Sequence, residues 1–554
     1  MYAEIRGLHQ SAYLLAGFAL ASQCLALVRD RLFAHYFGAG PVLDVYYAAF
    51  KIPDLLFVLF ASMLSVYVLI PFISEKTENG DDEGARHILS SVLSVFLGVY
   101  CVVALGVAFF ADSLSYFFFP GFSPSDHDTV VMLMRILLLQ PLLLGVSSLY
   151  GVITQLGQRF ALYAVSPLLY NGGIILGVIF LYPLLGMQGV VWGVVLGALL
   201  HLCIQIPFVR QSRLAPQLTF AIPMRTLGTI LANSIPRALT LSLSQIVSLS
   251  FVGIASTMTV GSVSVLQFAF NLQSVPLAII GVSYSVAAFP VLAQLYSKGD
   301  MEAFVGRVEM TLRHLVLWIV PLTGIIIVVR AQVVRTVLGS GAFDWDDTRL
   351  TAVVLSLFAV SLIAQSINLL IVRAFYAGGN TRTPFIVTII STVITLVVSF
   401  GLYTLFLFSP SFAVWMERLM RVEGVTGAEI MMLPLGYSLV QFGHMSVLLG
   451  IFIRSFHVPY KQLLATCART IVSTAGGVTV SYGALYLLTG AVRKETFGGI
   501  FLQGLLAGVG GIVAVVGILY LLRSPELREL WSSLRQRSLV VKVLGPEKID
   551  TLAL

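Results

Sequence analysis

Charged residues are scarce in this chain of 554 residues. Lysine, arginine, aspartate and glutamate make up 11% of it, against roughly 25% in an ordinary soluble domain. With 58% apolar residues and a mean hydropathy of +0.94, the chain lacks the polar residues that several water-exposed domains would need. The composition excludes a soluble protein and predicts a chain that crosses a membrane many times.

Cysteine is also rare, and catalytic signatures are missing. The four cysteines, Cys24, Cys101, Cys203 and Cys467, stand singly inside apolar stretches, so no short spacing among them could hold a metal ion or a small disulfide framework. The sequence contains no HExxH, GxxxxGK[ST] or GxSxG motif. We therefore predict a protein that is not an enzyme and that holds neither a metal nor an organic cofactor.

Long apolar runs, in contrast, are frequent. A membrane span needs about 20 predominantly apolar residues. Fourteen segments reach or approach that length, and they cover residues 8–28, 41–73, 87–110, 129–154, 160–182, 187–209, 227–255, 262–296, 310–329, 350–376, 383–408, 430–453, 461–489 and 497–522. The predicted fold class is an all-α polytopic membrane protein with about 14 transmembrane helices.

The distribution of positive charge predicts the orientation of these helices. With an even number of spans both termini lie on one side, and the loops of that side hold 20 of the 33 lysines and arginines. The opposite loops hold 9, and 4 fall within the segments. Since cytoplasmic loops are enriched in lysine and arginine, we predict that both termini are cytoplasmic. Topology also explains the net charge of +7, and a nucleic-acid partner is not expected.

Two pairs of glycines suggest an internal repeat. Gly40 and Gly261 open the second and eighth segments and are 221 residues apart, as are Gly157 and Gly378 in the loops after the fourth and tenth segments. An offset of six segments preserves orientation, so the halves would be parallel repeats related by an axis along the membrane normal.

The repeat gives a predicted division of the chain into four parts. Residues 1–209 form an N-lobe with helices 1 to 6, and residues 210–454 form a C-lobe with helices 7 to 12. Residues 455–522 hold helices 13 and 14. Residues 523–554 form a cytoplasmic tail, predicted to be a basic amphipathic helix because an N-cap signal at Ser524 and Pro525 precedes later cations.

Charges at membrane depth mark the candidate site, because an unpaired ion in lipid is costly. Asp44 and Lys51 lie seven residues apart on one face of the second segment, shortly after Arg29, Asp30 and Arg31. One interpretation is a hydrated cavity whose cations bind an anionic headgroup, with Asp30 and Asp44 as counter-ions or coupling groups. The other is an internal set of salt bridges that pins the first two helices together.

Further candidates lie near other segments. Arg237 near the start of the seventh segment and Asn271 in the eighth would extend the headgroup-binding set. Glycines and a proline-induced kink would let the cavity walls bend. The hinge candidates are Gly38, Gly40, Pro53, Gly261 and Pro276.

Several motifs resemble those of one family, the MurJ (MviN) lipid II flippases. They are 28-VRD-30, 37-FGAGP-41 with Asp44, 49-AFKIP-53, 158-QRF-160 with Ser166, Pro167 and Asn171, 261-GSVS-264, 281-GV-282 with Pro290, 373-RAFYA-377 and 381-TRTP-384. The resemblance spans nearly the whole chain, in order.

The resemblance implies two six-helix lobes around a central cavity and two C-terminal helices that form a groove for a polyprenyl tail. Such proteins, members of the wider MOP exporter superfamily, move lipid-linked peptidoglycan precursor across the bacterial cytoplasmic membrane by alternating access. Arg29, Asp30, Asp44 and Lys51 match cavity positions of the family. Coupling to the membrane potential or an ion gradient is implied, and the expected partners are the lipid-linked substrate, membrane lipids and cell-envelope synthesis proteins.

The chain departs from the family at several cavity positions. The family commonly has arginine at the position of Gln23, a basic pair at Phe57 and Val58, a carboxylate at Ser62, and an Asp-Arg pair at Phe270 and Asn271. We expect a lipid II flippase. A flippase for another polyprenyl-linked saccharide and a non-transporting membrane scaffold derived from this fold remain alternatives.

Overall fold

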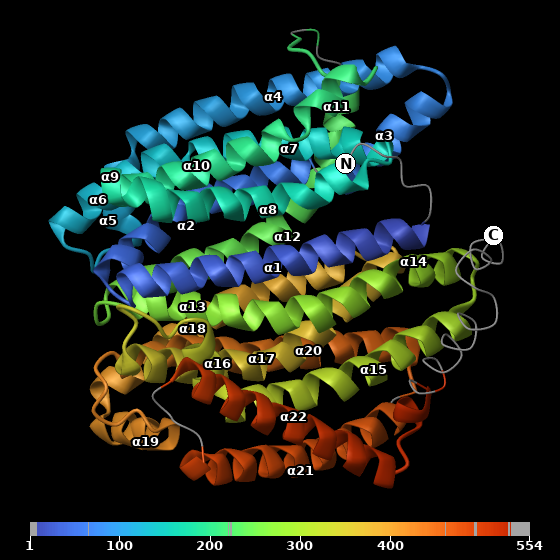
Figure 1. Cartoon of the computed structure of the whole chain (residues 1–554). Helices are drawn as coiled ribbons and strands as arrows, with labels where there is room; N and C mark the ends of the chain where they lie inside the picture. The colour runs from blue at the N-terminus through green and yellow to red at the C-terminus, as the bar shows by residue number, and fades with distance from the viewer. Residues whose placement is uncertain are drawn as a thin grey trace. The chain divides into compact units, whose positions relative to one another are not determined.

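The computed structural model describes residues 8–64, 66–219, 221, 224–459, 461–491, 496–529 and 532. Within these ranges the regular secondary structure is entirely helical (Figure 1). The chain forms two compact units. The first comprises residues 1–267 and 340–344, and the second comprises residues 268–339 and 345–554.

The first unit contains twelve α-helices, a π-helix and the start of α13. Their bounds are α1 Leu8–Phe37, α2 Pro41–Met63, α3 Val66–Glu78, α4 Asp82–Phe109, α5 Ala111–Phe118, α6 Pro124–Leu137, α7 Leu139–Leu156, α8 Phe160–Leu176, η1 Gly177–Leu181, α9 Tyr182–Leu185, α10 Met187–Cys203, α11 Ile206–Gln211, α12 Met224–Ser256 and α13 Ser262–Pro276.

The second unit contains the rest of α13 and the helices that follow it. They are η2 Leu277–Val282, α14 Ser283–Ser297, α15 Met301–Val328, α16 Arg330–Val337, α17 Trp345–Ala377, α18 Arg382–Phe408, α19 Pro410–Met420, η3 Ala428–Met431, α20 Met432–Phe456, α21 Lys461–Ala491 and α22 Phe497–Leu521.

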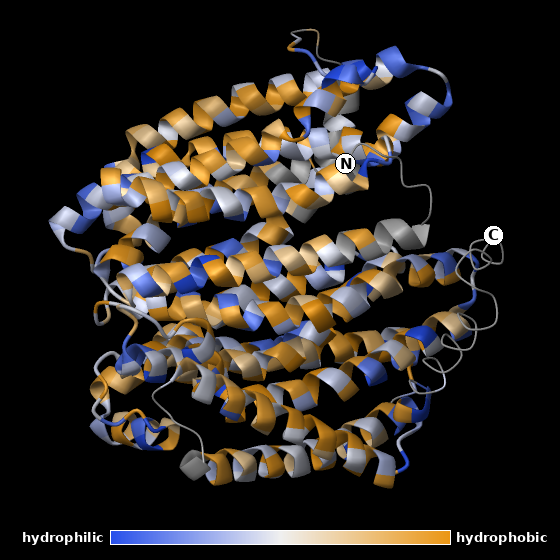
Figure 2. Cartoon of the chain, viewed as in Figure 1, coloured by the Kyte–Doolittle hydropathy of each residue, from blue (hydrophilic) through white to orange (hydrophobic). Residues whose placement is uncertain are grey.

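Twelve stretches of the described residues are helical, long and apolar enough to cross a membrane. They correspond to the third through fourteenth predicted segments. Figure 2 shows apolar residues along the length of the helices and hydrophilic residues gathered toward helix ends and loops. The all-α membrane fold is confirmed, whereas the count of 14, which includes the segments at 8–28 and 41–73, stays a prediction.

The first two predicted segments differ in detail from the helices found there. The first apolar run ends at residue 28, but α1 continues to Phe37, so Arg29, Asp30 and Arg31 lie within a helix rather than in a loop. Because Arg29 and Asp30 pair with each other, the helix can carry these charges. In the second segment, α2 continues through Pro53 and ends at Met63.

Each unit has its own core of interlocking side chains. In the first, Leu56 of α2, Phe96 and Tyr100 of α4 and Leu149 of α7 belong to one buried cluster. In the second, helices α14, α15, α17, α20 and α21 share another, which includes Phe304, Phe375 and Phe452. Since lipid tails are as apolar as leucine, such cores hold membrane helices together by close packing rather than by escape from water.

Small residues bring α8 and α10 into backbone contact. A methyl group added at Gly173 would collide with the backbone of Gly197, and one added at Gly177 would collide with that of Gly193. Glycines four residues apart on facing helices allow this close approach in membranes. The helices α8 and η1 therefore pack closely against α10.

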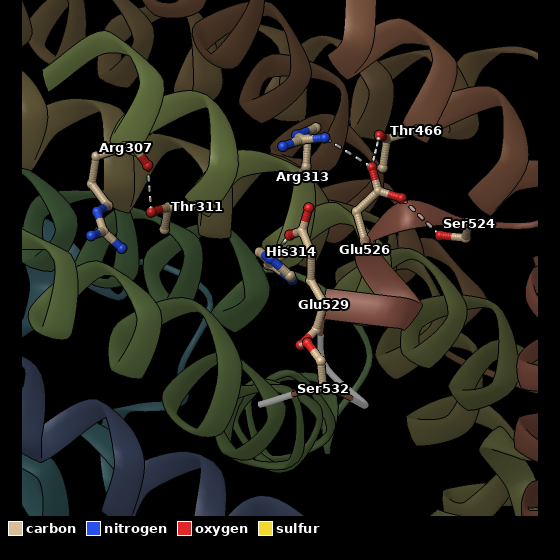
Figure 3. A network of polar contacts seen from close by, with 9 residues as sticks. All are labelled: Arg307, Thr311, Arg313, His314, Thr466, Ser524, Glu526, Glu529 and Ser532. Carbon is tan, nitrogen blue, oxygen red and sulfur yellow. Dashed lines mark hydrogen bonds and ion pairs between the residues drawn. The ribbon is translucent and has the colours of Figure 1, made fainter. Parts of the chain in front are cut away.

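The chain after α22 is tied to α15 and α21 by a polar network (Figure 3). The Glu526 carboxylate, only 1% exposed, accepts hydrogen bonds from Thr466 Oγ1 at 2.5 Å and Ser524 Oγ at 2.7 Å, and Arg313 Nη1 lies 3.4 Å away. Beside it, His314 Nε2 and Glu529 Oε2 are 3.1 Å apart. Burial by itself raises the pKa of the Glu526 carboxyl, but these donors and the Arg313 charge hold that pKa below its usual value.

The units divide the chain at a different place from the predicted lobes. The predicted boundary at residues 209 and 210 follows the repeat, whereas packing groups α12 with α2 in the first unit, which extends to residue 267. The four-part division stays a prediction. Of the predicted tail, the structure describes residues 523–529 and 532, and the rest lies outside the described residues.

Candidate functional site

A buried ion pair joins two of the predicted site residues on α1. Arg29 donates from Nε and Nη2 to Asp30 Oδ1 at 3.0 and 2.8 Å, and its Nη1 donates to Asn171 Oδ1 of α8 at 3.2 Å. The side chain of Arg29 is 20% exposed and that of Asp30 is 3% exposed. These bonds use three of the five guanidinium N–H groups, and the carboxylate offsets the positive charge.

Lys51 is buried between α2, α12 and α13 and is held by neutral partners. Its Nζ donates to Ser248 Oγ at 3.0 Å and to Gln267 Oε1 at 2.8 Å. Asp54, one turn further along α2, interacts electrostatically with it. A lysine that lacks a tight ion pair in a buried position keeps a strong tendency to attract an anion.

Asp54 links this lysine to α7 and α8. The Gln140 side chain interacts with its carboxylate, and Gln140 Nε2 donates to the Tyr170 hydroxyl at 3.1 Å. Asp54 was not among the predicted site residues, although it lies three residues after Lys51 and so on the same helix face. Gln140 and Tyr170 carry no charge and gave no comparable signal.

A cavity of about 420 Å³ adjoins this polar cluster within the first unit. It lies between α1, α2, α7, α8 and α10, and two of its lining residues belong to the hydrogen-bond network, because Ser22 accepts from Asn171 and Tyr170 accepts from Gln140. The full lining is Phe18, Ala19, Ser22, Gln23, Phe57, Leu144, Ser147, Ser148, Tyr163, Ala164, Pro167, Tyr170 and His201. The lining mixes hydroxyl, amide and imidazole groups with apolar side chains.

Asp44 occupies a different position from the other predicted charges. Its carboxylate accepts from Gly261 N at 2.6 Å, Ser264 N at 2.8 Å and Ser264 Oγ at 2.6 Å. The two backbone N–H groups lie at the start of α13, where helix donors have no partner within the helix, so Asp44 stabilises that helix end from α2. Its role as a coupling group or counter-ion stays a prediction.

The remaining headgroup candidates lie on α1, α12 and α13. Arg31 is half-buried on α1, and the side chain of Arg237 on α12 lies outside the described residues. Asn271 belongs to α13 in the second unit, where its carbonyl accepts from Ser274 Oγ at 2.7 Å. Their roles stay predictions.

The predicted hinges lie at helix ends and interruptions. Gly38 after α1 and Gly261 before α13 have φ values of +62° and +95°, a conformation that glycine adopts without strain. Gly40 caps α2, Pro53 lies inside α2, and Pro276 ends α13 directly before the π-helix η2. Bending at these positions stays a prediction.

Comparison with known proteins gives the family. The model of the family described as "Lipid II flippase MurJ" matches residues 33–505. The chain belongs to this family. Probable lipid II flippase MurJ of Buchnera aphidicola is 28% identical over 369 residues, which are 66% of this chain and 72% of the relative. Lipid II flippase MurJ of Burkholderia cenocepacia is 25% identical over 396 residues, which are 69% and 75% of the two chains.

Solved structures show the same fold. The inward closed conformation of lipid II flippase MurJ superposes with a TM-score of 0.71 at 21% identity, covering 92% of this chain and 99% of that one. An inward-facing MATE family transporter of the MOP superfamily superposes with a TM-score of 0.65 at 17% identity, covering 79% and 95%. The family resemblance and fold class predicted from the sequence are confirmed.

Proposed function

We propose that this chain moves lipid II from the cytoplasmic to the outer leaflet of the bacterial cytoplasmic membrane by alternating access. The match of residues 33–505 to the lipid II flippase family carries the proposal. Twelve candidate spans support a multi-pass membrane location. The excess of lysine and arginine in one set of loops supports cytoplasmic termini.

The buried cations would bind the anionic headgroup. A pyrophosphate that crosses a medium of low dielectric constant needs charged partners, and arginine can contact it through two N–H groups at once. Arg29 and Lys51 would supply these contacts, with Arg31, Arg237 and Asn271 as further candidates. Asp30 would release Arg29 when the phosphate arrives and bind it again afterwards.

One observation favours a second candidate. Gln23 and Phe57, at positions where the family commonly carries basic residues, line the cavity, so part of its wall is neutral. A polyprenyl-linked saccharide other than lipid II, with less negative charge on its headgroup, would suit such a wall. A scaffold without transport activity is the remaining alternative.

Complementation tests the proposal. Cells depleted of their own lipid II flippase should survive when this chain is expressed, and the Arg29→Ala and Lys51→Ala variants should fail to restore growth. Arg86→Ala, on the polar first turns of α4, is the matched control and should restore growth. Absence of rescue by wild-type chain that reaches the membrane would refute lipid II as the substrate.

A direct assay separates the alternatives. Proteoliposomes that contain the purified chain and either labelled lipid II or another labelled polyprenyl-linked saccharide report which lipid changes leaflet. Movement of the second lipid alone would favour the second candidate. Movement of neither would favour the scaffold.

A further inference from the structure

The short helix α19 begins where a membrane span ends. The span α18, Arg382–Phe408, has 27 residues, and at 1.5 Å per residue it is about 40 Å long. Since a bilayer is about 40–45 Å thick with its headgroup layers, α18 crosses the apolar layer and brings Phe408 to a membrane boundary. The helix α19, Pro410–Met420, starts two residues later and therefore lies at that boundary, at one end of the long helices of the second unit (Figure 1).

Three apolar side chains form a stripe along α19. Phe412, Trp415 and Leu419 recur at intervals of three and four residues, which places them on one face of the helix. The rings of Phe412 and Trp415 are neighbours, with centroids 6.2 Å apart. Trp415 is 57% exposed and Leu419 is 58% exposed, so the described part of the chain leaves this stripe largely uncovered.

The other faces of α19 are different. Met416 is buried against the rest of the unit. Glu417 lies two residues from both Trp415 and Leu419 and so points away from the stripe. Arg418 Nε pairs with Glu423 Oε1 at 3.2 Å. Residues 410–423 contain two arginines and two glutamates, so their formal net charge is zero. The exposed stripe is thus apolar, and the charges beside it balance.

The segment after α19 holds the helix in place. Arg421 ends α19 in the left-handed conformation, and its carbonyl accepts a hydrogen bond from Arg349 Nη2 of α17 at 3.0 Å. Val422 and Val425, which follow, are both buried. The helix is therefore attached at both ends, to α18 before it and to this buried turn after it, and its apolar stripe stays on the outside.

Continuity with α18 indicates what covers the stripe. Phe400 and Phe408 of α18 are 52% and 85% exposed, as expected for a span that faces lipid, and the exposed apolar surface continues from them onto α19. Trp345, 56% exposed, lies at the same end of the unit, because Arg349, one turn after it on α17, contacts Arg421. Tryptophan is enriched where a membrane meets water.

We propose that α19 docks in the boundary layer of the bilayer, with Phe412, Trp415 and Leu419 among the upper acyl chains, and anchors the end of α18 there. Because the stripe runs along the helix, all of it reaches the acyl chains only when α19 lies parallel to the membrane surface. Amphipathic helices with tryptophan, phenylalanine and leucine on the apolar face bind membranes in this way. On the proposed orientation this is the outer leaflet. The inference goes beyond the proposed function and does not depend on the substrate.

Fluorine nuclear magnetic resonance on the full chain measures the depth. The five tryptophans are replaced by fluorotryptophan, the chain is placed in phosphatidylcholine nanodiscs, and Trp415→Phe identifies the Trp415 signal. A nitroxide lipid labelled near the headgroup end of its acyl chain should broaden this signal more than one labelled near the methyl end. Trp318, 39% exposed in the middle of the predicted segment 310–329, is the matched control and should show the opposite order.

Three other results would each overturn the proposal. Broadening of the Trp415 signal mainly by the methyl-end label would place α19 inside the apolar layer. Broadening only by a water-soluble relaxation agent would place the stripe in water. Broadening by neither would mean that a second copy or another protein covers it.

A change of lipid tests whether apolar contact is the cause. Because the charges of residues 410–423 balance, the Trp415 broadening should be the same after part of the phosphatidylcholine is replaced by anionic phosphatidylglycerol. Broadening that requires the anionic lipid would show that charge binds the helix, which contradicts the proposal.

A variant tests the stripe itself. Phe412→Ser combined with Leu419→Ser keeps Trp415 as the reporter and removes the apolar side chains on both sides of it. We expect the Trp415 signal to lose its broadening by the headgroup-end label and to become sensitive to the water-soluble agent. Val414→Ser, at an exposed position off the stripe, is the control and should leave the signal unchanged. A double variant whose Trp415 keeps its depth would show that the stripe does not anchor α19.

Discussion

Buried charge lies in different places in the two compact units. In the first unit Asp30, Asp44 and Lys51 are buried on α1 and α2, and Arg29 lies beside them. In the second unit the buried charged residues among those described are Glu309, near the start of α15, and Glu526, beyond the end of α22.

The middle of the second unit uses neutral polar groups instead. Gln365 donates to Gln273 at 3.3 Å and to Ser361 at 2.7 Å, and Asn368 donates to Gln441. Amides and hydroxyls cost far less to bury than ions. On the proposed function, the buried charges of the first unit would bind the headgroup, whereas the charged network of the second unit holds Glu526 against Arg313 and Thr466.

The largest effect is expected when the ion pair of the first unit is broken. Arg29→Leu leaves Asp30 buried without its cation, and removal of one partner of a buried pair costs about 3–5 kcal/mol. We place this variant near 3 kcal/mol because Arg29 is 20% exposed. Thermal unfolding in detergent measures the loss, and complementation should fail.

A double variant separates stability from transport. Arg29→Leu combined with Asp30→Leu removes both charges and should recover most of the lost stability, since an apolar pair can replace a buried ion pair at little cost. Transport should stay absent. A double variant that transports at the wild-type rate would show that the pair only pins the helices.

Replacement of Asp44, which caps α13, should cause the next largest loss of stability. Asp44→Ala removes the acceptor for two backbone N–H groups and a hydroxyl, and we expect a loss of about 2 kcal/mol. Asp44→Asn keeps one acceptor oxygen and should lose about half as much, as measured by thermal unfolding. Loss of transport by Asp44→Asn at nearly unchanged stability would favour the coupling role instead.

Membrane spans and the helices that hold buried charges could be predicted from the sequence, because both depend on residues close together along the chain. Apolar length located twelve spans that the helices match, and the spacing of Arg29, Asp30 and Lys51 marked helices that do contain buried charges. Short sequence motifs predicted the family, and the match of the family model to residues 33–505 confirms that prediction.

Contacts between distant segments were beyond sequence reasoning. Arg29 and Asn171 are 142 residues apart, and Lys51 and Gln267 are 216 residues apart. Asn and Gln give no charge signal and are common in loops, so only the packing of α1 on α8 and the contact of α2 with α13 show that they are partners. The end of α1 was missed because a helix can continue past its apolar stretch when its charges pair internally.

A smaller effect is expected in the charged network of the second unit. Glu526→Gln replaces an anionic acceptor of two hydroxyl donors by a neutral amide, and hydrogen bonds to charged groups are worth about 1.5–3 kcal/mol. Since the amide keeps one acceptor, we expect a loss of about 1.5 kcal/mol at pH 7, measured by thermal unfolding, with transport retained. Loss of transport at unchanged stability would contradict the division of roles between the units.

The smallest expected effect is the pH dependence of the stability that the Glu526 carboxylate provides. The folded-state pKa of Glu526 lies below its ordinary value of 4.5, so the unfolded chain binds the proton first. Its stabilising contribution is therefore complete above that value and is lost as the pH falls through the lowered pKa. The stability difference between wild type and Glu526→Gln should be constant from neutral pH down to the ordinary value and should shrink below it. A difference that instead grows on acidification would mean that the protonated carboxyl is the form that ties residues 524–529 to α15 and α21.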